Sequence, residues 1–87
     1  MNDELDLLAM RTGNRLMDQG LSLVTAESCT GGWIASCMTS VAGSSAWFDC
    51  GFVTYSNQSK SLLLGVDPNL ISAVGAVSEE VVSAMVM

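Results

Sequence analysis

The 87-residue sequence predicts an α/β fold in which helices pack in layers against a sheet. Two observations predict it. Segments with apolar residues at helical spacing alternate with short runs rich in β-branched and aromatic residues, and glycines or capping residues separate these segments. Only two strands can be recognised, whereas typical sheets have about five. We therefore expect residues 1–87 to form the N-terminal part of one larger domain, truncated after its first strands and helices.

The first helix is predicted over residues 3–19 and the first strand over residues 21–26. A mostly apolar stripe at helical spacing supports the helix and comprises Leu5, Leu8, Ala9, Thr12 and Leu16. Acidic residues in its first turn suit the positive end of the helix dipole. Gly20 fits the position just after a helix, where left-handed backbone is common.

The second helix is predicted to begin near Thr30, and the second strand to run from Trp47 to Tyr55. One face of that helix carries Ile34, Cys37, Met38 and Val41, and the glycine–serine run at 42–45 ends it. Three short helices follow the second strand. Their boundaries are marked by glycines and capping residues: Gly65, Asp67 with Pro68, Gly75, and Ser78 with Glu79 and Glu80.

Composition excludes several classes of function. The net charge is −6, and the only cations are Arg11, Arg15 and Lys60, so the chain lacks the basic surface that nucleic acids or anionic membranes require. Three cysteines without C-x-x-C spacing indicate neither a disulfide framework nor a zinc site. We expect a cytoplasmic protein without a signal peptide, a membrane span, a metal or a cofactor.

The segment Thr25-Ala26-Glu27-Ser28-Cys29-Thr30-Gly31-Gly32 is the first candidate site. It follows a predicted strand and opens a helix, where unpaired backbone N–H groups favour negative charge. Ser28 there suits a nucleophile whose product is an oxyanion. The alternative is an ordinary helix cap, the commonest use of serine and threonine at this position. Cys29 is a further possible nucleophile, which we rank below Ser28.

A base for Ser28 must be something other than histidine, because the chain contains none. Lys60 is the sole lysine, and Tyr55, the sole tyrosine, lies five residues upstream at the end of the second strand. A lysine kept neutral by burial can accept the proton of a serine, and a tyrosine can orient it or relay the proton. The alternative is a solvated lysine in a polar turn.

Five segments in this order resemble the CinA C-terminal domain family, and most closely its stand-alone PncC-type members. They are residues 25–32, Gly43-Ser44-Ser45-Ala46-Trp47-Phe48, Gly51-Phe52-Val53-Thr54-Tyr55-Ser56-Asn57, Leu64-Gly65-Val66 and Gly75-Ala76-Val77-Ser78-Glu79. The resemblance covers essentially the whole chain. It implies a three-layer α/β/α sandwich, no metal, and a homodimer in the full-length protein.

The resemblance also implies an activity, the hydrolysis of nicotinamide mononucleotide to nicotinate mononucleotide and ammonia in pyridine-nucleotide recycling. The family's nucleophile maps to Ser28, and its assisting residues map to Tyr55 and Lys60. Backbone around Cys29, Thr30, Gly31 and Gly32 would bind the substrate and stabilise the oxyanion. Two alternatives stay open: a non-catalytic module that holds a nucleotide phosphate at the same helix N-terminus, and an inactive fragment of the same family.

Overall fold

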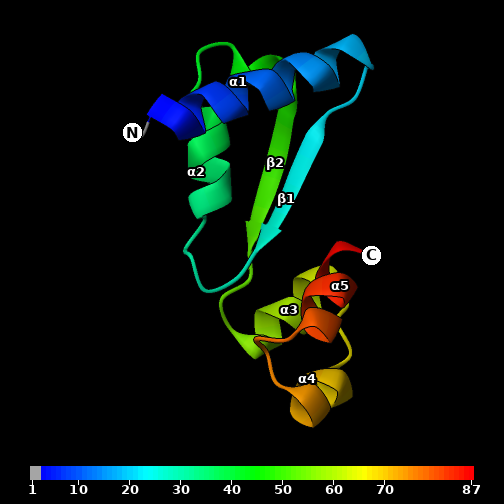
Figure 1. The fold of residues 1–87 in the computed structure, drawn as a ribbon. Coiled ribbons are helices and arrows are strands. Elements are labelled where there is room, and N and C mark those ends of the chain that lie inside the picture. The colour runs from blue at the N-terminus through cyan, green and yellow to red at the C-terminus, as the bar shows by residue number, and fades with distance from the viewer. Residues whose placement is uncertain (1–2) are drawn as a thin grey trace.

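The computed structural model of the chain describes residues 3–87; residues 1 and 2 of the predicted unit lie outside this range. It contains the predicted order of helices and strands (Figure 1). The elements are α1 (Asp3–Asp18), β1 (Leu23–Glu27), α2 (Trp33–Thr39), a 3-10 turn (Ser44–Ala46), β2 (Phe48–Val53), α3 (Asn57–Leu64), α4 (Pro68–Val74) and α5 (Glu79–Val86). None of the helices described is long and apolar enough to cross a membrane.

The helix ends follow the capping residues that the sequence indicated. Gly20 has a φ of 66°, and the N–H of Leu21 donates to the carbonyl of Leu16 over 2.9 Å, which closes α1 in a Schellman motif. The side chain of Asp67 accepts from the N–H of Asn69, and that of Ser78 accepts from the N–H of Val81. These caps satisfy backbone donors that the first turn of a helix leaves unpaired.

The second helix is shorter than predicted, because it begins at Trp33 and ends at Thr39. Gly31 and Gly32 both have positive φ values, of 68° and 98°, so neither belongs to a right-handed helix. The segment between β1 and α2 is therefore a turn of several residues, and Ser28 lies five residues before the start of the helix at Trp33, not at the helix N-terminus as the sequence suggested.

The two strands form a parallel pair in which Thr25 lies opposite Gly51 and Glu27 opposite Val53. A parallel pair requires a crossover connection, and α2 with the following 3-10 turn supplies it. One face of the sheet packs against α2: a Cβ built on Gly51 would lie 3.5 Å from the Cβ of Ala35. The other face remains open beside Val24, which is 50% exposed.

The main hydrophobic core lies beyond the carboxyl ends of the strands, where α3, α4 and α5 gather (Figure 1). It comprises Val66, Ile71, Val81 and Met85, with Ala26 of β1 packed against it. At the other end of the sheet, α1 packs on the indole of Trp47, which is 4% exposed. Trp33, in contrast, is 59% exposed.

The molecule is elongated and exposes more surface than a closed domain of its size. Its extents are 40 × 27 × 18 Å and its radius of gyration is 14.4 Å, against about 12 Å for a compact chain of this length. The accessible surface is 5786 Å², whereas about 4,900 Å² is typical of this mass. The arrangement is a partial α/β fold, consistent with the predicted class.

Candidate functional site

Ser28 lies in a tight turn directly after β1. The N–H of Thr30 donates to the carbonyl of Ser28 over 2.8 Å, and Cys29 between them has a φ of 70°. An i to i+2 hydrogen bond around a residue of positive φ is a γ-turn of the rare, strained type. A non-glycine residue in this region costs about 1–2 kcal/mol, so the surrounding structure must hold the turn in place.

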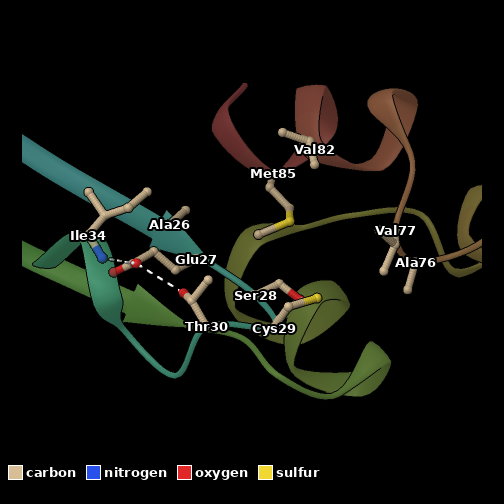
Figure 2. Close-up of a pocket in the computed structure, with 10 residues that line it drawn as sticks. All are labelled: Ala26, Glu27, Ser28, Cys29, Thr30, Ile34, Ala76, Val77, Val82 and Met85. Carbon is tan, nitrogen blue, oxygen red and sulfur yellow. Dashed lines mark hydrogen bonds between the residues drawn. The ribbon is translucent and has the colours of Figure 1, made fainter.

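Ser28 and Cys29 line a cavity of about 210 Å³ between this turn and α5 (Figure 2). The Oγ of Ser28 and the Sγ of Cys29 are 3.7 Å apart, and both side chains point toward the part of the wall formed by Ala76 and Val77. The opposite wall is apolar and is formed by Ala76, Val77, Val82 and Met85. The cavity therefore combines a hydroxyl and a thiol with a surface suited to a flat, weakly polar group.

Glu27 lies beside Ser28 but points away from the cavity centre toward α2 (Figure 2). Its side chain is 4% exposed. The carboxylate accepts hydrogen bonds from the N–H groups of Ile34, over 2.5 Å, and Ala35, over 3.0 Å, and from the hydroxyl of Thr30, over 3.3 Å. The first turn of α2 thus binds a carboxylate of the chain itself.

This contact bears on the alternative of a phosphate-binding module. That hypothesis requires free N–H groups at the start of α2, yet the donors of Ile34 and Ala35 are occupied by Glu27. A phosphate placed there would also face the buried carboxylate, and like charges at short range repel. The structure therefore disfavours phosphate binding at this helix end.

Lys60 is buried, with 1% of its surface exposed, so the alternative of a solvated lysine is wrong. Its Nζ donates to the carbonyl of Thr54 over 3.0 Å and to that of Tyr55 over 3.3 Å. These bonds tie α3 to the chain that leaves β2. The side chain of Tyr55 is 71% exposed, and Lys60 contacts its backbone.

The predicted site residues fall into two groups. Ser28, Cys29 and Thr30 line the cavity, whereas Tyr55 and Lys60 do not. Within residues 3–87 no hydrogen bond joins Ser28 to either of those two. Glu27 pairs with Val53, so the residues that follow them, Ser28 and Thr54, leave the sheet side by side. The carbonyl of Thr54 accepts the hydrogen bond from the Nζ of Lys60. Gly31 and Gly32 form the exit of the turn toward α2.

Sequence reasoning missed the apolar wall and the role of Glu27. The wall is distant in sequence from Ser28, and its periodicity indicated only a helix face. Glu27 belongs to the segment 25–32 that contains Ser28, but no local sequence pattern shows that its carboxylate reaches α2. Among the residues described, no cluster of histidine, cysteine or acidic side chains has the arrangement of a metal site.

Sequence comparison finds a matching family model and curated relatives. A family model described as the CinA C-terminal domain matches residues 5–87. The nicotinamide-nucleotide amidohydrolase PncC of Escherichia coli (strain K12) is 50% identical over 84 residues, covering 97% of this chain and 51% of that protein. The protein of the same name from Pseudomonas putida is 55% identical over 84 residues, covering 97% and 52%.

Structural comparison agrees. The crystal structure of the competence/damage inducible protein CihA from Agrobacterium tumefaciens matches with a TM-score of 0.94 and 44% identity, covering 98% of this chain and 52% of that one. The chain spans about half the length of the curated relatives it matches. These matches confirm the predicted α/β class and the resemblance read from the motifs. The chain belongs to the CinA C-terminal domain family.

Proposed function

We propose that the chain carries the nucleophile of an amidohydrolase that converts nicotinamide mononucleotide to nicotinate mononucleotide and ammonia, and that Ser28 is this nucleophile. The observation that carries the proposal is the position of Ser28, in a strained turn on the wall of a cavity of about 210 Å³. Relatives named nicotinamide-nucleotide amidohydrolase are 50% and 55% identical to the chain over 84 residues. The apolar wall around Met85 offers a surface for the pyridine ring.

In this mechanism the Oγ of Ser28 attacks the carboxamide carbon, the carbon–nitrogen bond breaks, and ammonia leaves with the proton of the serine hydroxyl. Water then hydrolyses the acyl ester, which releases nicotinate mononucleotide and restores the serine. Cys29 lines the cavity, and its N–H is the candidate donor for the tetrahedral oxyanion, since that of Thr30 is bound to the carbonyl of Ser28. One such donor is worth about 10²–10³ in kcat.

Lys60 is the base in this proposal, assisted by Tyr55. Its amine is buried beside the strand end that neighbours Ser28, and a serine nucleophile requires a general base close by. To contact Ser28, the Nζ of Lys60 must release its hydrogen bond to the carbonyl of Thr54 or of Tyr55 and turn toward the serine hydroxyl. Cytoplasmic location and a homodimer in the complete protein stay predictions.

The test measures ammonia release from nicotinamide mononucleotide with a glutamate dehydrogenase-coupled assay. Two proteins are compared: the 87-residue chain, and a hybrid in which the C-terminal half of the Escherichia coli relative follows it. Ser28→Ala is expected to lower kcat at least 10³-fold, while substrate binding measured by calorimetry is retained. The matched control is Cys29→Ala, which alters the neighbouring cavity residue and keeps measurable turnover. Activity that survives Ser28→Ala in a folded hybrid would refute the assignment.

A further inference from the structure

Glu27 is fixed at both its backbone and its side chain. Its carbonyl accepts from the N–H of Thr54 over 2.8 Å and from the hydroxyl of Thr54 over 3.4 Å. Its carboxylate accepts from Ile34 and Ala35, seven and eight residues further along the chain. Glu27 therefore joins three elements, β1, the end of β2 and the first turn of α2. Ser28 is covalently attached to this fixed point.

The carboxylate closes residues 28–33 into a loop of fixed length between β1 and α2. Within that loop Cys29, Gly31 and Gly32 all have positive φ values, of 70°, 68° and 98°. Of these three, Cys29 is the one whose side chain opposes such a conformation. The turn around Ser28 is thus held by contacts at its two ends, and the carboxylate of Glu27 is the side chain that makes the contact with α2.

We propose that Glu27 is a positioning residue for the Ser28 hydroxyl. Its carboxylate anchors the start of α2, keeps the γ-turn at Cys29 in place, and thereby aims Ser28 into the cavity. A neutral amide of the same shape is a poor substitute, because its NH₂ group would face one of the two N–H donors instead of accepting from it. This inference rests on the proposed nucleophilic role of Ser28.

The test uses Glu27→Gln, with Glu79→Gln as the matched control. Glu79 is an exposed acid in the first turn of α5, so the control makes the same change of charge at a helix start without touching the turn. In the hybrid that releases ammonia, Glu27→Gln is expected to lower kcat about 10–100-fold and change KM less than 3-fold, because misplacing a reacting group by ~1 Å costs about 10²-fold. The control is expected to change neither.

A second measurement on the 87-residue chain does not depend on catalysis. In a background with Cys37 and Cys50 replaced by alanine, the alkylation rate of the exposed Cys29 reports the turn conformation, and hydrogen exchange reports the amides of Ile34 and Ala35. Glu27→Gln is expected to change the alkylation rate and to abolish the protection of both amides. If Glu27→Gln does not fold, Glu27→Asp, which shortens the reach by one methylene, is expected to show the same effects at about 3–10-fold in kcat.

The outcomes separate the two proposals. Lost amide protection together with an unchanged kcat would overturn the positioning role and leave the nucleophile intact. Unchanged protection and alkylation would overturn the anchor itself. Absence of ammonia release from the unsubstituted hybrid would overturn the proposed function, and the positioning role with it.

Discussion

Gly13→Ala is expected to reverse the usual effect of replacing a helical glycine by alanine, and the reason lies in the tertiary packing of α1. In an isolated helix interior, replacing glycine by alanine stabilises by about 0.5–1 kcal/mol. In this structure a Cβ on Gly13 would lie 2.6 Å from the Cζ2 of Trp47, with Cε2 and Nε1 of the indole also in contact. Carbon atoms normally approach to about 3.5–4.0 Å, so the indole must move by roughly 1 Å or more.

The magnitude follows from what holds Trp47. Its side chain is 4% exposed, and its carbonyl accepts from the N–H of Leu23 over 2.7 Å, which fixes the backbone at the start of β2. Overpacking of this kind costs about 1–3 kcal/mol, which exceeds the helix-propensity gain. For a chain of this size, a net loss of 1 kcal/mol lowers Tm by about 4–8 °C.

The assay measures tryptophan fluorescence in a Trp33→Phe background, in which Trp47 is the only tryptophan of the sequence. Gly13→Ala is expected to shift the Trp47 emission to the red and to lower the urea midpoint. The control is Asn14→Ala, an exposed position of the same helix, which is expected to raise stability by about 0.5 kcal/mol with unchanged emission. If Gly13→Ala matched this control in both readouts, the packing of α1 on Trp47 would be refuted.

Two further predictions concern stability and surface. Lys60→Met removes the donor to the carbonyl of the fully buried Thr54 and is expected to destabilise by about 1–3 kcal/mol, measured by urea unfolding. An unchanged midpoint would mean that the amine does not anchor α3 to the end of β2. Phe52→Thr on the open sheet face, where Val24 and Phe52 are 50% and 37% exposed, is expected to reduce binding of the apolar dye ANS. Equal dye binding by both proteins would place the exposed apolar surface elsewhere.

Local rules predicted most elements, because their signals lie within a few residues of each other. Gly20 ends α1, Asp67 and Pro68 begin α4, and Ser78 begins α5, as capping chemistry requires. The predicted start of α2, near Thr30, was wrong by about three residues, because the helix begins at Trp33. Its first turn is capped by Glu27, a residue of the preceding strand, and such a contact leaves no pattern in the neighbouring sequence.

The candidate site shows the same division. The motif around Ser28, together with the absence of histidine, made Ser28 the candidate nucleophile and directed attention to Tyr55 and Lys60. Only the structure shows that Lys60 is buried on two carbonyls, with the side chain of Tyr55 pointing into solvent. Contacts of this kind depend on where a second strand ends in space, which spacing along the chain does not specify.

The sequence by itself determined the α/β class, the family and the residues that can carry chemistry, because each depends on residue type and short-range spacing. The tertiary structure decided what those residues do to one another. It placed Ser28 opposite an apolar wall formed by α5 and the segment just before it, placed the carboxylate of Glu27 on the N–H groups at the start of α2, and left one face of the sheet open. These outcomes follow from packing between segments that are distant in sequence.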